Sequence, residues 1–381
     1  HYTITIFHPN ISKAPAQWSS MPKSAIGQLE QIAAQIHKQL NLGMVPEMNL
    51  PTRSKANIIF DQQQQVWKYG KLRTTRTAKK LDGAYMLLRT TYLLDFIRDM
   101  VGQQKSSTLR ELYYISEGWD LGKFHSQDES NKLIEDLEII TNFQREDFKI
   151  RPEEDGAKVL GDLTLTEINR KGKPMRINCR DDVGDTGYAI PYNVEPEKIT
   201  FNNSGNARCI IAIETGGMFD RLVENGFDES HGAILVHIKG QPARSTRRFL
   251  QRLSDETSLP LLVFTDADPW SYRIYGSIAY GAIKTAHISH LLATPSARYL
   301  GVTPSDITNY ELPHDELTER DRQALKSMRS DPRFLNDYWS SEIELQLELG
   351  LKAEQQALAK YGLDYVTDEY LPEKLKQLGL A

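Results

Sequence analysis

The sequence predicts a chain of two folded parts, an α+β part followed by an α/β part with a parallel sheet and C-terminal helices. In the second part, an apolar run followed by a helical segment occurs three times between residues 209 and 282, which indicates a parallel α/β sheet. In the first part, three helical segments precede two short strands, the order typical of a winged helix-turn-helix (CAP-like) domain. At 381 residues the chain has room for two or three domains.

The composition restricts where the protein acts. The formal net charge is −5, so the whole chain is not a general binder of polyanions, and any surface for nucleic acid must be local. The two cysteines, Cys179 and Cys209, form neither a CxxC pair nor a disulfide framework, which favours a reducing, cytoplasmic compartment and two buried thiols. No apolar run approaches the length of a membrane span, and the first residues lack the pattern of a signal peptide.

The N-terminal region combines an alternating stretch, Tyr2–Phe7, that is typical of a strand with a helical pattern over Ala25–Leu40. A basic patch follows, with no acidic residue between Asp61 and Asp82. Its members are Lys68, Lys71, Arg73, Arg76, Lys79 and Lys80. Two interpretations stay open: the patch contacts the phosphates of a nucleic acid, or it is a solvated segment that packs against the acidic remainder of the chain.

The α+β part is predicted to hold three helices and a β hairpin. Its first two helices are Leu81–Val101 and Leu109–Glu117, the second capped by Ser107 or Thr108. The third helix follows a capping box at residues 126–129, and the strands of the hairpin are Phe148–Ile150 and Val159–Leu165. Because the third helix is strongly acidic, we do not expect it to read bases in a groove of DNA.

The short second helix contains a candidate nucleophile. Its apolar face consists of Leu109, Leu112 and Tyr113, so Tyr114 is turned about 100° away from the core. Arg110 lies four residues before Tyr114, on the same side of the helix. An outward tyrosine beside an arginine could attack a phosphodiester, with the guanidinium binding the phosphate or stabilising the phenolate. The alternative is an exposed tyrosine that makes an ordinary hydrogen bond.

Polar residues follow each strand of the α/β part at its carboxyl end. They are Glu214, Lys239, and the pair Asp266 and Asp268, and the carboxyl ends of parallel strands lie along one edge of a sheet. Neighbouring carboxylates repel one another, and a divalent cation, with magnesium suited to oxygen ligands, removes that repulsion. The structural alternative is that one aspartate caps the next helix and the other belongs to a turn. The strands are predicted at Cys209–Ile213, Gly232–Ile238 and Leu261–Phe264.

The C-terminal region shows helical periodicity over Phe334–Leu349, Lys352–Lys360 and Leu371–Leu378. We expect these helices to pack around the sheet or to form an interface between protomers.

A family resemblance emerges from the combination of motifs. Glu214 followed about fifty residues later by Asp266-Ala267-Asp268 is similar to the acidic pattern of Toprim domains. Together with the sequences at 110–114 (Arg-Glu-Leu-Tyr-Tyr), 239–242 (Lys-Gly-Gln-Pro) and 246–250 (Thr-Arg-Arg-Phe-Leu), the chain resembles the A subunits of archaeal DNA topoisomerase VI, the type IIB enzymes, from about residue 50 to its end. The meiotic double-strand-break transesterases share that fold. Ser271 stands where many relatives place Gly, a departure that we expect to affect only a turn.

The resemblance implies a role for each candidate residue. Tyr114 would be the nucleophile that forms a 5′-phosphotyrosyl bond, and Arg110 would stabilise charge. Glu214, Asp266 and Asp268 would bind Mg²⁺ as the only cofactor of this chain. Apart from the resemblance, the basic residues that we expect to contact the phosphates of DNA are Lys68, Arg73, Arg76, Lys79, Lys239 and Arg247.

The resemblance also implies an assembly and a domain plan. Two protomers would each cut one strand of double-stranded DNA, the tyrosine of one facing the metal site of the other. The B subunit of topoisomerase VI would bind ATP in an A2B2 heterotetramer, in agreement with the lack of a P-loop pattern in this chain, and the complex would work on the cytoplasmic nucleoid. The expected domains are an N-terminal extension (1–67), a winged-helix domain with the tyrosine (68–155), and a Toprim domain with C-terminal helical elements (156–381).

Two other functions are compatible with the same motifs. A recombination-type transesterase would cut DNA without relaxing it, and ATP-dependent relaxation in the presence of the B subunit separates that function from a topoisomerase. A non-catalytic winged-helix DNA-binding protein would bind no magnesium and would be indifferent to Asp268→Ala.

Overall fold

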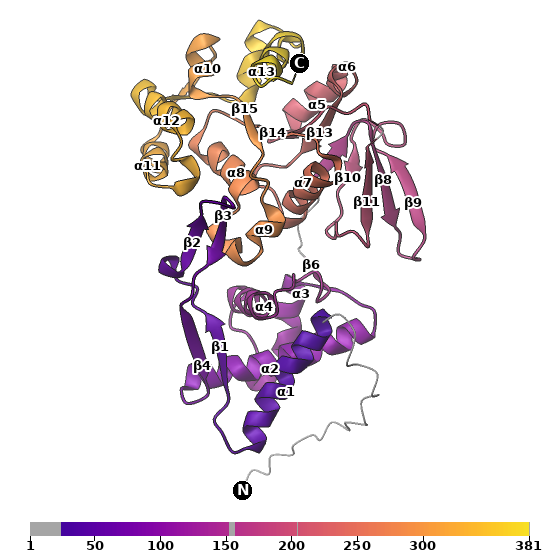
Figure 1. The fold of residues 1–381 in the computed structure, drawn as a ribbon, viewed down its shortest axis with the longest axis vertical. Coiled ribbons are helices and arrows are strands. Elements are labelled where there is room, and N and C mark those ends of the chain that lie inside the picture. Colours follow the sequence, from indigo (N-terminus) through magenta and orange to yellow (C-terminus); the bar gives the residue numbers. More distant parts are fainter. Residues whose placement is uncertain (1–23, 152–156, 204, 381) are drawn as a thin grey trace. The chain divides into compact units, whose positions relative to one another are not determined.

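The structure is a computed structural model that describes residues 24–151, 157–203 and 205–380 (Figure 1). By their contacts, the described residues form two compact units: unit 1 contains those of His1–Asn49 and Thr75–Ile150, and unit 2 those of Leu50–Thr74 and Arg151–Ala381. Residues 50–74 therefore group with the C-terminal part. The domain boundaries after residues 67 and 155 stay predictions, and the expected strand Tyr2–Phe7 lies outside the described residues.

Unit 1 is built on four helices around one apolar core. They are α1 (Ala25–Asn41), α2 (Leu81–Gly102), α3 (Leu109–Ile115) and α4 (Gln127–Thr141). The helical predictions for all four segments are confirmed, because apolar residues at helical spacing face a shared core. Leu112 of α3 and Leu133 of α4 have no exposed surface, whereas Leu40, at the end of α1, is exposed.

Two local predictions for unit 1 are wrong. Ser126 is the N-cap of α4, but its side chain accepts no capping hydrogen bond; the carboxylate of Glu129 instead accepts from the backbone N–H of His125, at 2.8 Å. The expected hairpin of 148–150 with 159–165 is also not formed. β6 (Ile150–Arg151) pairs with β5 (Ser107–Thr108), and the apolar run that was expected to complete the hairpin joins the sheets of unit 2.

The centre of unit 2 is a six-stranded sheet in the order β10-β7-β13-β12-β14-β15. The strands are β7 (Lys158–Leu160), β10 (Tyr188–Ala189), β12 (Cys209–Ile213), β13 (Ala233–His237), β14 (Leu261–Phe264) and β15 (Arg298–Gly301). The last four are mutually parallel, and β7 and β10 add an antiparallel edge. All side chains of β12 and β14 are buried, as expected for parallel strands covered on both faces. The predicted parallel α/β sheet is therefore confirmed.

Helices cover both faces of this sheet (Figure 1). One face packs against α7 (Arg244–Thr257) and α8 (Pro269–Tyr280), together with α11 (Glu319–Met328) and α12 (Asp337–Leu349). The other packs against α5 (Gly216–Glu224), α6 (Phe227–His231), α10 (Pro304–Asn309) and α13 (Leu371–Gln377). Two separate apolar clusters result, and each includes alternate residues of β12. This alternation follows from the side-chain period of two along a strand.

The described residues also form smaller sheets. A three-stranded sheet, in the order β11-β8-β9, consists of β8 (Leu163–Ile168), β9 (Pro174–Asn178) and β11 (Ile199–Asn203), so the stretch 170–192 that the sequence indicated as turns contains two strands, β9 and β10. The remaining pairs are β1 (Glu47–Pro51) with β4 (Arg73–Thr77), β2 (Ile58–Asp61) with β3 (Val66–Tyr69), and β16 (Asp315–Glu316) with β17 (Leu351–Lys352). Trp67, which is interleaved with the predicted basic patch, is buried, and its ring packs on Phe60.

The C-terminal predictions hold for two of three segments. α12 and α13 form as expected, but Lys352–Lys360 is not one helix. Lys352 ends β17, and a 3₁₀ helix covers Gln355–Tyr361. The backbone is extended here because Ala353 forms a bridge with Ala267, whose N–H donates to the Ala353 carbonyl at 2.8 Å. Among the residues that the structure describes, no helix has the length and apolar character needed to cross a bilayer.

Candidate functional site

An acidic pocket lies at the carboxyl ends of two adjacent parallel strands of unit 2. Glu214 directly follows β12, and Asp266 and Asp268 follow β14, which pairs with β12 in parallel. These three carboxylates line one hollow of about 240 Å³. Its other lining residues are Trp270, Ser271, Asp315, Lys352, Ala353 and Glu354. Parallel pairing thus brings together residues that lie about fifty positions apart in the chain.

Each of the three carboxylates is oriented by a backbone N–H group. The N–H of Asp266 donates to Glu214 Oε2 at 3.2 Å, and the N–H of Gln355 donates to Asp266 Oδ1 at 2.8 Å. Asp268 is the N-cap of α8 and accepts from the N–H of Trp270 at 2.7 Å. The capping role that the sequence left open for one aspartate is therefore present. It occupies Oδ1 of Asp268, and Oδ2 faces Lys352 at 3.5 Å.

Burial dominates the electrostatics of the acidic pocket. It raises the pKa of Asp266 to about 7, and the nearby charges of Glu214, Glu354 and Asp268 act in the same direction. Burial likewise raises the pKa values of Glu214 and Asp268. A bound cation would stabilise the charged form of all three groups. The donor set, carboxylate oxygens in one small hollow, fits a hard divalent cation such as Mg²⁺.

The carboxylate oxygens do not converge on a single point in this arrangement. Within 24–151, 157–203 and 205–380, no three His, Cys, Asp or Glu side chains are grouped closely enough to hold a metal ion. Each candidate ligand turns one oxygen toward a backbone N–H. Carboxylate oxygens are suitable ligands for a metal ion. To bind one, these side chains would have to turn their other oxygens toward a common point.

Sequence reasoning missed the segment that forms one wall of the acidic pocket. Lys352, Ala353 and Glu354 line it, and the fully buried Gln355 ties it to both strand ends. The side chain of Gln355 donates to the carbonyl of Phe264 at 3.1 Å and accepts from the hydroxyl of Thr215 at 3.0 Å. Helical periodicity placed this segment in the predicted helix Lys352–Lys360, which gave no sign of a role at the strand ends.

Ser271 also departs from expectation. It does not belong to a turn, because it lies in the first turn of α8 and is buried. Its side chain makes a hydrogen bond with Glu214 that lowers the pKa of that carboxyl and offsets part of the effect of burial. The residue therefore takes part in orienting the acidic pocket.

Tyr114 stands on the surface of unit 1, at the end of α3. Its side chain is 58 % exposed, whereas Leu112 is fully buried, so the predicted orientation of the helix is confirmed. A capping box between Thr108 and Glu111 begins α3, with N–H to oxygen distances of 3.0 and 2.7 Å. Arg110 is exposed one helical turn before the tyrosine. Tyr114 and Glu111 both border a hollow of about 670 Å³.

The predicted DNA-contact residues divide into two groups. Lys68, Arg73, Lys79 and Lys239 are exposed, and Lys68 forms an ion pair with Asp61. Arg76 pairs with Asp136 of α4 at 2.6 Å, and Arg247 on α7 is only 6 % exposed. The first group presents positive charge to solvent, whereas Arg76 is paired within the protein and Arg247 is buried.

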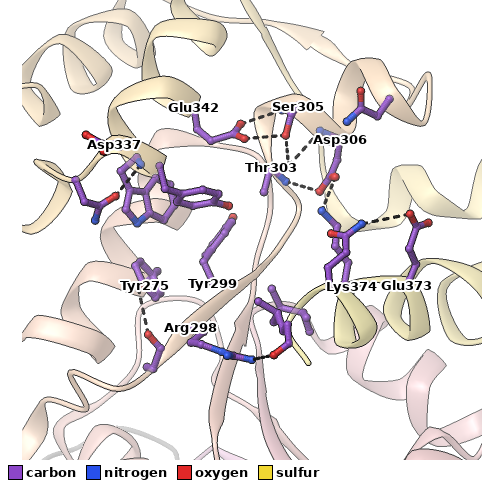
Figure 2. A pocket seen from close by; sticks show the side chains of 18 of the residues that line it. Tyr275, Arg298, Tyr299, Thr303, Ser305, Asp306, Asp337, Glu342, Glu373 and Lys374 are labelled. Carbon is purple, nitrogen blue, oxygen red and sulfur yellow. Dashed lines mark hydrogen bonds and ion pairs between the residues drawn. The ribbon is translucent and has the colours of Figure 1, made fainter. Parts of the chain in front are cut away.

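A larger cavity, of about 960 Å³, lies elsewhere in unit 2 (Figure 2). Several of its charged groups have partners within the protein. Lys374 contacts Asp306 at 2.5 Å, and Glu342 accepts from the hydroxyl and the N–H of Ser305, at 2.8 and 3.0 Å (Figure 2). None of the predicted site residues lines this cavity. Most of its lining residues belong to α10, α12, α13 and β15.

The parallel sheet with a glutamate and an Asp-x-Asp pair at adjacent strand ends is the arrangement of a Toprim domain. Family models support each part of this description. The model of the Toprim domain shared by the topoisomerase 6 A subunits and Spo11 matches residues 209–375. The models "All-beta domain in DNA topoisomerase VI alpha subunit" and "Type IIB DNA topoisomerase" match residues 153–205 and 85–150. The chain belongs to the family of type 2 DNA topoisomerase 6 A subunits.

Curated relatives carry this family assignment over most of the chain. The type 2 DNA topoisomerase 6 A subunit of Archaeoglobus fulgidus is 57 % identical, across 92 % of this chain and 96 % of the relative. That of Methanosarcina mazei is 56 % identical, across 92 % and 95 %. That of Haloarcula marismortui is 54 % identical, across 93 % and 95 %. The three-stranded sheet that the sequence did not indicate falls within the all-beta match.

Proposed function

We propose that this chain is the DNA-cleaving and rejoining component of an ATP-dependent type IIB topoisomerase. The observation that carries the proposal is the joint presence of an exposed tyrosine on α3 and an acidic pocket at the ends of β12 and β14, in a chain of this family. A nucleophile for phosphoryl transfer and a site for a charge-neutralising cation are the two parts that such a reaction requires.

Tyr114 acts as the nucleophile. Its phenolate oxygen forms a bond to the phosphorus of a backbone phosphodiester while the bond to the 3′ oxygen breaks, and that oxygen leaves as a hydroxyl after taking a proton. The product is a 5′-phosphotyrosyl link, and the reverse step restores the DNA without new energy input because the phosphoester bond is conserved. Arg110 holds the phosphate through charge-assisted hydrogen bonds.

Mg²⁺ is the cofactor that we assign to the acidic pocket, with Glu214, Asp266 and Asp268 as its ligands. When bound, it supplies charge neutralisation and a template for the phosphoryl group. Ser271 and Gln355 orient two of these carboxylates from neighbouring elements. The proposed contacts to DNA remain Lys68, Arg73, Arg76, Lys79, Lys239 and Arg247. Because Arg247 is buried, we expect it to contribute least to DNA binding.

The assembly follows from the family. We infer a homodimer on double-stranded DNA in which the tyrosine of one protomer serves the acidic pocket of its partner, and the topoisomerase VI B subunit, which binds ATP, completes an A2B2 complex. The four-helix unit 1 serves as the winged-helix DNA-binding domain, although its wing is not the hairpin that the sequence suggested. A cytoplasmic, nucleoid-associated location fits these partners.

The decisive experiment uses Tyr114→Phe in the full chain, together with the family's B subunit, ATP, Mg²⁺ and supercoiled plasmid. Wild type is expected to relax the plasmid and, after denaturation, to leave protein covalently attached to DNA 5′ ends. Tyr114→Phe is expected to lose both activities. Tyr113→Phe is the matched control, because its ring packs toward the core, and it should retain them. Covalent adducts formed by Tyr114→Phe would refute the assignment.

A further inference from the structure

The acidic pocket contains a cation of its own, the ammonium group of Lys352. Its Nζ lies 3.5 Å from Asp268 Oδ2 and 3.1 Å from Asp321 Oδ2. Five carboxylates line the hollow, and Lys352 is the one basic residue among its lining residues. The carboxylates are Glu214, Asp266, Asp268, Asp315 and Glu354. Lys352 is therefore the internal counter-charge nearest to a proposed metal ligand.

Asp321 provides a firm anchor for this ammonium group. It is 3 % exposed and caps α11 by accepting from the hydroxyl and the N–H of Thr318, at 2.8 and 3.0 Å. Its other oxygen accepts from the indole N–H of Trp270 at 2.9 Å. These hydrogen bonds hold the pKa of Asp321 at about 2 despite burial, so its negative charge persists at neutral pH.

The backbone fixes Lys352 relative to the Asp-x-Asp pair. Lys352 is followed by Ala353, which bridges Ala267, the residue between the two aspartates. The fully buried Gln346 donates to the carbonyls of Ala267 and Leu351, at 2.9 and 3.1 Å, and locks the two segments together. Sheet-like pairing thus fixes the backbone of Lys352 beside the Asp-x-Asp pair.

We propose that Lys352 is a positioning residue that competes with the divalent cation for Asp268 and thereby sets the metal affinity of the acidic pocket. Without metal, the ammonium group shares Asp268 Oδ2 and holds that carboxylate in place. When a cation binds, Asp268 turns its free oxygen to the metal, and Lys352 stays paired with Asp321. This inference rests on the proposed magnesium site.

The two possible roles of Lys352 predict opposite changes in metal affinity when the lysine is removed. If the lysine only maintained the shape of the pocket, its removal would weaken metal binding or leave it unchanged. If it competes for Asp268, its removal takes away a positive charge that lies 3.5 Å from a proposed metal ligand, and metal binding should become stronger because like charges near one another repel at a protein surface.

The test measures metal binding directly, on the full chain without DNA. Mn²⁺ binding is followed by electron paramagnetic resonance and Mg²⁺ binding by calorimetry, for wild type, Lys352→Met, Lys352→Gln and Lys352→Arg. The first two variants are expected to bind about tenfold more tightly than wild type, and Lys352→Arg, which keeps the charge, within about twofold. Lys326→Met removes an exposed charge on α11 and should match wild type.

Several results would overturn the proposal. Equal or weaker binding by both neutral variants, with circular dichroism showing that at least one is folded, assigns Lys352 a purely structural role. Tighter binding by Lys326→Met as well would assign the effect to overall charge. If wild type binds neither Mn²⁺ nor Mg²⁺, the proposed metal site itself fails, and that outcome is distinct because it does not involve the lysine variants.

Discussion

Gln355→Ala tests how the acidic pocket is built. Gln355 has no exposed surface, and its side chain connects the ends of two parallel strands: it donates to Phe264 of β14 and accepts from Thr215, which follows β12 by two residues. Its backbone N–H, which holds Asp266, is retained in the variant. The substitution thus removes the side-chain link without altering any proposed metal ligand.

The expected cost is about 2–4 kcal/mol in the free energy of unfolding. Two hydrogen bonds, at 3.1 and 3.0 Å, are lost at about 1 kcal/mol each. The space left by the buried amide adds about 1–2 kcal/mol, because the surrounding backbone relaxes only partly. The Phe264 carbonyl keeps a second partner, the N–H of Glu214 at 3.1 Å, which limits the total.

The neighbouring glutamine is a natural control. Gln356 is exposed and makes a single side-chain hydrogen bond to Thr215, at 3.1 Å, so Gln356→Ala should cost less than about 1 kcal/mol. Urea unfolding of the metal-free chain, followed by circular dichroism, compares the variants. Hydrogen exchange at residues 261–268 localises the effect. Equal costs for the two alanine variants would show that Gln355 does not hold the strand ends together.

Two further predictions concern the two halves of the proposed site. Leu112→Ala, at a fully buried position of α3, should lower the free energy of unfolding of the helical unit by about 2–5 kcal/mol. Tyr114→Phe, at an exposed position, should stay within about 0.5 kcal/mol of wild type. Thermal unfolding measures both, and comparable losses would mean that α3 does not face the core as described. The pKa of Asp266 is raised from 3.8 to about 7, so the folded metal-free chain binds an extra proton between these values and loses stability as pH rises from about 4 to 7. Asp266→Asn should remove this contribution, and identical pH–stability curves for variant and wild type would contradict the raised pKa.

Local signals in the sequence predicted most of the elements around the site. The strand Leu261–Phe264 was predicted at the residues where it forms, because an apolar run closed by Asp and Pro has few alternatives. Helix periodicity likewise predicted that Tyr114 points outward, because Leu112 and Tyr113 lie on the face of the helix that packs against the core. The expected capping box at residues 126–129 is not formed, because Glu129 accepts from the N–H of His125 instead. The two arrangements differ by no more than the energy of one hydrogen bond, which sequence patterns do not resolve.

The pairing of strands was beyond such local reasoning. Val159 and Leu160 were expected in a hairpin with 148–150, yet they pair with β13, which lies more than seventy residues further along the chain. Which strands pair depends on how both faces of the sheet are buried in the whole fold. The residues of one strand show that it is apolar but do not show which strand it pairs with. The same holds for the stretch 170–192, whose two strands are too short and polar to be recognised alone.

By itself, the sequence determined the parallel α/β fold, the three carboxylates at its strand ends and the exposed tyrosine, because periodicity and strand-end chemistry are local properties. Only the tertiary structure decided how those carboxylates are held. Lys352 lines the acidic pocket, and Gln355 and Asp321 hold residues around it, from positions about 50 to 140 residues away from their partners, with the help of pairings such as Ala267 with Ala353. Contacts at such separation depend on which surfaces pack together when the chain folds, and that depends on the free energy of the whole unit.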